Sequence, residues 1–325
     1  MRKIVIVAAL AALAAGSAAA RDLEEILTSG KLVVGLRRTP TTYVVDQKTG
    51  VEGGFTWELA SAFAAGLGLR LEVVTIPTFA DLWTLDGKLP PGYDKDPALA
   101  YTPDLYRSVD FAADILSPLP WRERLVAMVP FIENTDIVLA RKDLGLKSHR
   151  DLAGRRTFVV AGMASYASFT AKMKELGMPY VEEPVTVADL ETEPRLVTAA
   201  GPTQPSARSG PVRLHVVPAG TPFKSFTGVW LIHSNQVDFG VSDYLTVLLQ
   251  LWDNPSFRGS VVPAFSFSGA AQPLCFTLAK DRPRLAAELA RFFAAAKADG
   301  RFSALVRKYT GFTYAEYLAV MGGKP

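Results

Sequence analysis

The spacing of hydrophobic residues changes in a regular order between residues 21 and 74, and this order predicts a small α/β unit. Residues 31–36 form a continuous, β-branched apolar run, and residues 70–75 alternate between apolar and polar, as strands do. Between these two runs, apolar residues recur at the spacing of one helix face. These residues are Phe55, Leu59, Phe63 and Leu67. Strand, helix and strand in this order favour a parallel βαβ unit.

Two shorter elements complete this first unit. Asp22 precedes an apolar-periodic segment and can cap a short helix that ends at Gly30. Residues 43–45 and 51–55 flank the turn Asp-Gln-Lys-Thr-Gly at 46–50, which indicates a β-hairpin with a longer loop.

A second α/β pattern follows, with strands and helices again in succession. The predicted strands cover residues 111–116, 125–131, 135–140, 157–161, 237–241 and 274–278. The predicted helices cover residues 166–176, 223–234, 243–252, 282–297, 301–309 and 313–321. Residues 130–134 and 261–267 are candidate connections between two lobes.

Two long segments interrupt these patterns. Residues 86–107 and 190–222 are rich in Pro and Gly and predict irregular structure. Loops of this length are uncommon unless they are functional or mobile. The role of these two segments is not evident from their composition.

The first 20 residues have the composition of a cleavable export signal. Arg2 and Lys3 precede an apolar run from residue 4 to 15, and three alanines at 18–20 form a small-residue cleavage site. The apolar run is too short for a spanning helix, and no cysteine follows it for lipid attachment. We therefore expect a periplasmic protein of about 305 residues, enough for two lobes of ordinary size.

Charge and chemistry exclude several classes of function. Without Arg2 and Lys3, the 35 basic residues fall to 33 against 32 acidic ones, so no strong charge favours nucleic acid. The three histidines lack zinc-site spacing and the acidic residues of segment 86–107 lack a calcium-loop pattern, so we expect no metal and no cofactor. Cys275 is a lone cysteine in an apolar run and is expected to be buried.

Six motifs in order resemble the family 3 extracellular solute-binding proteins, which have the type II periplasmic binding fold. The motifs are LTSGKLVVG at 27–35, GFTWELA at 54–60, PWRER at 120–124, DLAG at 151–154, NQVDFGVSD at 235–243 and ADG through RKYTG at 298–311. The stretch RTPTTY at 38–43 is similar to the binding-protein-like half of membrane-bound lytic transglycosylases.

The resemblance implies an α/β protein of two lobes with a ligand cleft between them and two hinge crossings. Lobe 1 is predicted to comprise residues 21–133 and 265–325, and lobe 2 residues 134–264. Lobes of this kind close on the ligand by hinge motion.

The resemblance also implies five ligand-binding residues. Arg124 corresponds to the family's carboxylate-binding arginine, whose planar guanidinium suits a bidentate contact. Arg122 is the alternative, because the segment is shorter than in the family and Pro120 and Trp121 replace its usual polar residues. Asp243 corresponds to the acid that receives the ligand's ammonium, although a helix N-cap also favours Asp.

Tyr43 corresponds to an aromatic wall over the ligand, with packing in the hairpin as the alternative. Ser165 opens a predicted helix after a strand, where backbone N–H groups can hold an anion.

The predicted function is that of a periplasmic binding protein for an amino acid or related carboxylate. Such a protein would act as a monomer without catalysis and would deliver its ligand to an ABC permease in the inner membrane. One alternative is an accessory or sensor protein, to which the two long segments would contribute an interface. The other is a cyclohexadienyl-dehydratase-like enzyme, for which Glu58 and Glu133 are the candidate acids.

Overall fold

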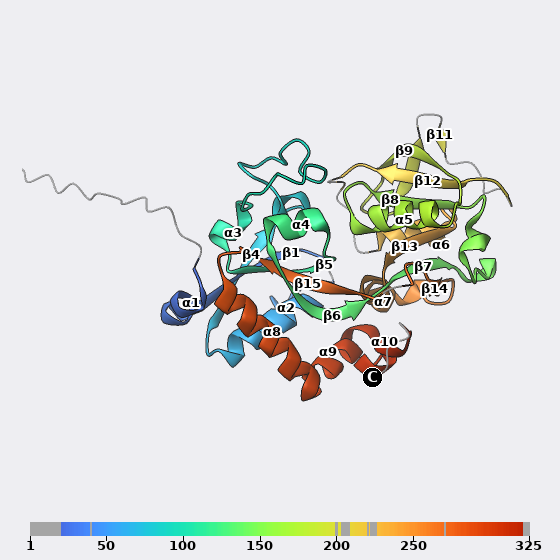
Figure 1. The fold of residues 1–325 in the computed structure, drawn as a ribbon. Coiled ribbons are helices and arrows are strands. Elements are labelled where there is room, and N and C mark those ends of the chain that lie inside the picture. Colours follow the sequence, from blue (N-terminus) through green and yellow to red (C-terminus); the bar gives the residue numbers. More distant parts are fainter. Residues whose placement is uncertain are drawn as a thin grey trace, which may run out of the picture.

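Two lobes, each with its own β-sheet, make up the chain (Figure 1). The computed structural model describes residues 21–39, 41–198, 201–202, 209–219, 221, 226–269 and 271–320. The predicted export signal at residues 1–20 lies outside the described residues. The chain leaves the first sheet after Asn134 and returns to it at Gln272. Lobe 1 therefore comprises the described residues up to Asn134 and from Gln272 onward, and lobe 2 comprises the described residues between them.

The sheet of lobe 1 has the strand order β4-β1-β5-β15-β6. Its strands are β1 (Lys31–Arg37), β4 (Arg70–Ile76), β5 (Phe111–Leu116), β6 (Ala127–Asn134) and β15 (Gln272–Leu278). β1 is parallel to both β4 and β5, and this confirms the predicted βαβ unit. β15, which comes from the far end of the chain, lies antiparallel between β5 and β6.

Both faces of this sheet are buried, by different kinds of structure. Alternate residues of β1 point to opposite sides: Leu32, Val34 and Leu36 join the cluster formed with α2 (Phe55–Gly66) and α8 (Pro283–Ala298), and Val33 joins another. The second face is covered by residues 77–110 and 117–125, which include α3 (Leu105–Ser108) and α4 (Pro120–Leu125). Segment 86–107 is therefore part of the packing of lobe 1.

Lobe 2 contains two groups of strands that lie next to each other. The first has the order β11-β10-β9-β12-β8 and the second the order β13-β7-β14. The strands are β7 (Asp136–Arg141), β8 (Arg156–Val160), β9 (Tyr180–Ala188), β10 (Arg195–Thr198), β11 (Gly201–Pro202), β12 (Val212–Val217), β13 (Phe239–Asp243) and β14 (Val261–Ser266). β8 and β13 are neighbours, and the Asp238 amide donates to the Arg156 carbonyl at 2.9 Å.

Helices α5 (Ala164–Glu175), α6 (Thr227–His233) and α7 (Tyr244–Asp253) belong to lobe 2. The remaining elements of lobe 1 are α1 (Leu23–Ser29), α9 (Arg301–Thr310), α10 (Tyr314–Val320) and the small hairpin of β2 (Val44–Val45) and β3 (Glu52–Gly53).

The expectation of irregular structure throughout residues 190–222 was wrong. β10 and β12 both lie in this segment, and β12 is the strand that joins β9 to β8. Val212 and Leu214 of β12 are fully buried in the core of lobe 2. Prolines and glycines lie on both sides of this short strand, and their presence led to the prediction of irregular structure here.

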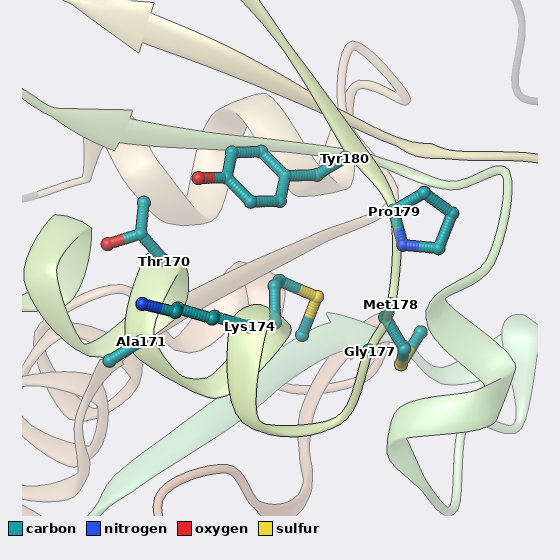
Figure 2. Close-up of a pocket in the computed structure, with 8 residues that line it drawn as sticks. Thr170, Ala171, Lys174, Gly177, Met178, Pro179 and Tyr180 are labelled. Carbon is teal, nitrogen blue, oxygen red and sulfur yellow. The ribbon is translucent and has the colours of Figure 1, made fainter.

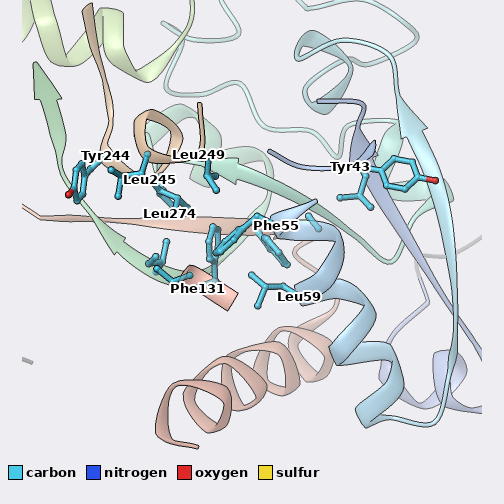
Figure 3. Packing of buried hydrophobic residues seen from close by; sticks show 14 of the residues in the cluster. Tyr43, Phe55, Leu59, Phe131, Tyr244, Leu245, Leu249 and Leu274 are labelled. Atoms are coloured by element: carbon cyan, nitrogen blue, oxygen red, sulfur yellow. The ribbon is translucent and has the colours of Figure 1, made fainter. Parts of the chain in front are cut away.

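An apolar core joins the lobes on the side of the two crossings. α7 of lobe 2 packs against α9 of lobe 1, and Tyr244 stacks on Tyr317 with ring centroids 5.1 Å apart. Figure 3 shows Tyr244, Leu245 and Leu249 of lobe 2 beside residues of lobe 1. The Asn134 side-chain oxygen accepts from the Leu245 amide and the Tyr317 hydroxyl, both at 3.3 Å.

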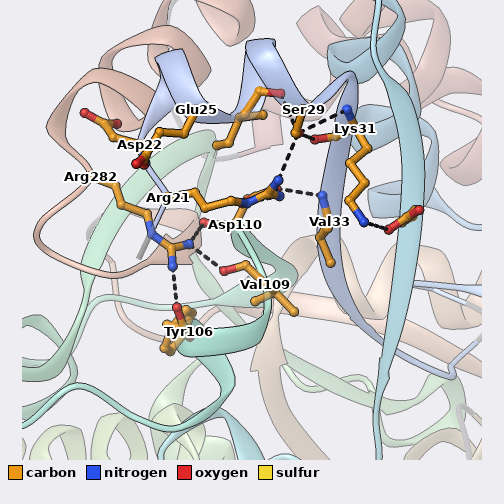
Figure 4. A network of polar contacts seen from close by, with 12 residues as sticks. Arg21, Asp22, Glu25, Ser29, Lys31, Val33, Tyr106, Val109, Asp110 and Arg282 are labelled. Carbon is orange, nitrogen blue, oxygen red and sulfur yellow. Dashed lines mark hydrogen bonds and ion pairs between the residues drawn. The ribbon is translucent and has the colours of Figure 1, made fainter. Parts of the chain in front are cut away.

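A buried arginine ties the start of α8 to the sheet of lobe 1. The Arg282 guanidinium donates to the carbonyls of Tyr106, Val109 and Asp110, and the residue is 2% exposed. The Asp110 carboxylate accepts from Arg21 at 2.7 Å and from the Val33 amide at 2.7 Å (Figure 4). These bonds connect the first described residue, β1, β5 and α8.

We expect Arg282→Ala to lower the free energy of unfolding by about 3 kcal/mol, because three buried carbonyls would lose their donor. Arg284→Ala is the matched control on the same helix: Arg284 is 62% exposed and pairs only with Glu24 among the described residues. A surface ion pair of this kind is worth less than about 1 kcal/mol. Urea unfolding followed by circular dichroism measures both values, and equal losses would contradict the assignment.

Candidate functional site

Strand ends in both lobes supply the candidate site. In lobe 1 these are the ends of β1, β4 and β5, followed by α4. In lobe 2 they are the ends of β8 and β13, together with the start of the antiparallel β7. Ligands of open α/β sheets bind outside such strand ends. Charged residues at these positions include Arg122 in α4, Asp136 at the start of β7 and Asp243 at the end of β13.

Arg122 lies at the contact between the lobes and is 2% exposed. One terminal nitrogen donates to the Ser117 carbonyl at 3.0 Å in lobe 1, and the other to the Gly162 carbonyl at 3.4 Å in lobe 2. Its Nε has no hydrogen-bond partner among the described residues. Burial lowers the pKa of Arg122 to about 10, so it remains a cation at neutral pH.

Three aromatic rings surround the Arg122 guanidinium. Its Cζ lies 5.2 Å from the ring centroids of Phe79 and Trp83 and 5.1 Å from that of Trp121. The nearby carboxylate of Asp114 is bonded to Arg37 instead. In the described part of the chain, Arg122 is thus a buried cation held by ring faces and carbonyls, without an acid. Such a cation can receive a ligand carboxylate.

Arg124 does not reach the same place. α4 is only six residues long, and residues two apart on a helix project about 200° from each other. Arg124 instead donates through Nη2 to the Asp96 carbonyl at 2.9 Å, in segment 86–107. The geometry favours Arg122 over Arg124 as the residue that faces lobe 2, and Arg124 instead ties the segment to α4.

Asp243 ends β13 and caps α7, and its Oδ1 accepts from the Thr246 amide at 2.8 Å. Burial and, to a smaller extent, the neighbouring charge of Asp136 raise the pKa of Asp243 to about 6, despite this bond. Asp136 is its direct cross-strand partner, at the first residue of β7. Burial also raises the pKa of Asp136, and a hydrogen bond from Ser168 opposes this shift.

The sequence analysis did not identify Asp136, although it sits opposite Asp243. Residues directly opposite in an antiparallel pair project from the same face of the sheet. Two carboxyl groups and the Ser168 hydroxyl therefore gather at the edge of lobe 2. Burial disfavours the charged form of each carboxyl group, and neither has a basic partner among the described residues. A nearby cationic group would therefore stabilise both carboxylates.

The remaining two predicted residues have other surroundings. The Tyr43 ring is 6% exposed and packs in the core of lobe 1, and its hydroxyl donates to Glu52 at 2.5 Å. Burial raises the pKa of Tyr43 to about 12. Ser165 lies in the first turn of α5, three residues after Gly162, and is partly exposed. Ligand contact by either residue stays a prediction.

The candidate acids of the enzyme alternative lie on lobe 1 and are paired. Glu58 accepts from Lys308 at 2.6 Å and from the Tyr309 hydroxyl. Glu133 accepts from Lys297 at 3.3 Å and from the Tyr314 hydroxyl. Across the described residues, no group of three or more His, Cys, Asp or Glu side chains could hold a metal ion.

Two pockets lie away from the contact between the lobes. One, of about 530 Å³, is on lobe 2 between the end of α5 and the start of β9, with Lys174 and Tyr180 in its lining (Figure 2). The other, of about 320 Å³, is on lobe 1 between α2, α8 and α9. Neither contains Arg122, Asp136 or Asp243. As far as the helices are described, none is long and apolar enough to cross a membrane.

Comparison with known sequences gives partial matches. No protein-family model matches the chain. It is 30% identical over 160 residues to membrane-bound lytic murein transglycosylase F of Ectopseudomonas mendocina, covering 47% of this chain and 28% of that protein. The same enzyme of Pseudomonas putida is 30% identical over 172 residues, covering 52% and 32%. The chain thus spans about a third of the curated relatives it matches.

Comparison with solved structures covers most of the chain. A substrate-binding protein of an ABC uptake transporter from Streptococcus pneumoniae, with bound histidine, has a TM-score of 0.57 at 15% identity, covering 90% of this chain and 96% of that one. The amino acid ABC transporter substrate-binding protein AbpA from the same organism, bound to L-arginine, has a TM-score of 0.55 at 18% identity (89% and 98%).

The ancestral amino acid-binding protein AncCDT-1, described as a precursor of cyclohexadienyl dehydratase, has a TM-score of 0.56 at 20% identity (88% and 98%). These likenesses agree with the strand orders and the two crossings. The chain has the two-lobe α/β fold of type II periplasmic binding proteins, as found in amino-acid-binding proteins.

Proposed function

We propose that this chain is a periplasmic binding protein for a small solute that carries both a carboxylate and an amino group, such as an amino acid. The observation that carries the proposal is Arg122, a buried cation without an acidic partner among the described residues, at the contact between two lobes of this fold. A guanidinium in such a place suits a ligand carboxylate.

The charges on the two lobes are complementary to a zwitterion. Arg122 belongs to lobe 1, whereas Asp243 and Asp136 belong to lobe 2. A ligand with a carboxylate at one end and an ammonium at the other would contact both lobes and stabilise their closure. Arg122 is almost fully covered in the closed arrangement, so the ligand would enter when the lobes open about the two crossings.

The proposed biological role is delivery of the ligand to an ABC permease, after export through the signal at residues 1–20. The chain would act as a monomer that binds without catalysis. Two structurally similar proteins that are bound to amino acids are substrate-binding proteins of ABC transporters, and this similarity supports the proposed role.

An accessory or sensor role is the second candidate. The specific observation in its favour is that the curated sequence relatives are cell-wall enzymes by name, and that the match covers about half of this chain. Capture of a periplasmic partner by the full chain, with no stabilisation by any amino acid, would favour this candidate.

Replacement of Arg122 by Ala is expected to weaken ligand binding by about 10- to 100-fold, since a charge-assisted contact is worth about 1.5–3 kcal/mol. A thermal-shift screen of amino acids and small carboxylates identifies the ligand, and calorimetry at pH 7.5 measures the affinity. Arg122→Lys retains the charge without the planar fork and should give an intermediate affinity.

Arg124→Ala is the matched control on the same helix, and the expected affinity is close to that of the unchanged protein. Circular dichroism establishes that each variant is folded. The assignment to Arg122 fails if Arg124→Ala abolishes binding and Arg122→Ala does not. The proposed function fails if no amino acid or small carboxylate stabilises the protein.

Affinity should also fall as the pH decreases below about 6, the pKa of Asp243. The carboxylate, not the protonated acid, attracts the ligand's ammonium, so each unit below the pKa removes up to about tenfold in affinity. Asp243→Asn retains a side-chain acceptor for the α7 cap. This variant should bind weakly at pH 7.5 and lose less affinity between pH 7.5 and 5 than the unchanged protein, with the remaining loss due to Asp136, whereas an unaltered pH profile would exclude Asp243.

A further inference from the structure

The lobes touch on the side opposite the crossings through a small set of side chains. From lobe 1, Arg122 donates to the Gly162 carbonyl at 3.4 Å. Tyr93, in segment 86–107, also reaches Gly162: a methyl group built on its Cα would lie 3.1 Å from the Tyr93 hydroxyl oxygen. Gly162 lies on lobe 2, between β8 and α5.

Tyr93 is fixed on lobe 1, so its contact with Gly162 restricts the movement of one lobe relative to the other. Its ring packs edge-to-face on Trp121, with centroids 5.2 Å apart. The segment that carries it is fixed by bonds from the Tyr101 hydroxyl to the Trp83 carbonyl at 2.6 Å and from Arg124 to the Asp96 carbonyl at 2.9 Å.

Gly162 has a backbone conformation and surroundings that suit this contact. Its φ is +79°, in the region that favours glycine. The absence of a side chain allows Tyr93 to approach the backbone directly and leaves the Gly162 carbonyl free to accept from Arg122. A Cβ at this position would crowd the Tyr93 hydroxyl, which would have to move by a few tenths of an ångström, and it would also be strained at this φ.

The cost of burying Arg122 also points to a role beyond packing. An arginine without an acid loses hydration that carbonyls and ring faces replace only in part. An apolar side chain of similar size would fill the space among Phe79, Trp83 and Trp121 more cheaply. The bond to Gly162 is the contact of the Arg122 guanidinium that only the closed arrangement supplies.

We propose that Arg122 and Tyr93 form a latch on Gly162 that holds the lobes closed when no ligand is bound. The crossings and the core between α7 and α9 join the lobes at one side, and this latch joins them at the other. A ligand carboxylate would compete with the Gly162 carbonyl for the same guanidinium. The latch itself does not depend on the proposed ligand, so its test can be made without one.

The test measures the distance between the lobes in the ligand-free full-length protein. Spin labels are placed on Lys88→Cys in lobe 1 and Ala171→Cys in lobe 2, both exposed positions. The native Cys275 is 1% exposed and burial raises the pKa of its thiol to about 12, so it should remain unlabelled. Pulsed electron resonance then gives the distribution of distances.

The latch predicts a narrow distribution for the unchanged protein and a shift to longer distances for Gly162→Ala. Gly177→Ala is the matched control, because Gly177 also has a positive φ, +62°, but no atom within 4 Å of the built methyl group. This control should leave the distribution unchanged. Adding Tyr93→Phe to Gly162→Ala removes the hydroxyl that the added methyl group crowds and should restore the shorter distances.

Two results would overturn the latch. One is a ligand-free protein already as open as Gly162→Ala, which would mean that nothing holds the empty lobes together. The other is a Gly162→Ala distribution identical to that of Gly177→Ala. Neither result bears on whether an amino acid binds, which the affinity measurements of Arg122→Ala decide separately.

Discussion

The structure depends on the place of β15 in the sheet of lobe 1. This strand follows the whole of lobe 2 in the sequence, yet it lies between β5 and β6 and pairs with both. Lobe 1 therefore cannot complete its sheet until the chain has passed through lobe 2 and returned. The return brings the two crossings side by side. The pairing of β15 with β5 and β6 joins residues far apart in the sequence, and pairing of this kind is slow to form in folding.

The same constraint explains why the lobes are joined so differently at their two sides. Beside the crossings, chain connectivity fixes the approach of α7 to α9, so an apolar core can form there. At the far side no covalent link holds the lobes, and contacts are made by a charged and a polar side chain against backbone. The first side is held by buried apolar surface, whereas the second is held by a few polar contacts that break when the lobes separate.

The sequence pattern predicted the elements whose apolar residues have a clear periodicity. It did not predict an element whose structure depends on contacts with residues distant in the sequence. β1, α2 and β4 were predicted within one or two residues, because one apolar face or run marks each of them. β12 was missed, since its identity as a strand depends on pairing with β8 and β9 rather than on its neighbours in sequence.

The candidate site shows the same division. Asp243 was identified from its position before a helix, but Asp136 lies 107 residues away and became visible only through strand pairing. Arg122 and Arg124 differ by two positions, and only the direction of a short helix separates the one that faces lobe 2 from the one that holds a loop.

Residues 77–110 and 117–125 serve two purposes. They cover one face of the sheet in lobe 1, where Trp83 and Tyr106 are fully buried, and they present Tyr93 and Arg122 to lobe 2. A substitution in these residues that alters the contact with lobe 2 would therefore also alter the folding stability of lobe 1.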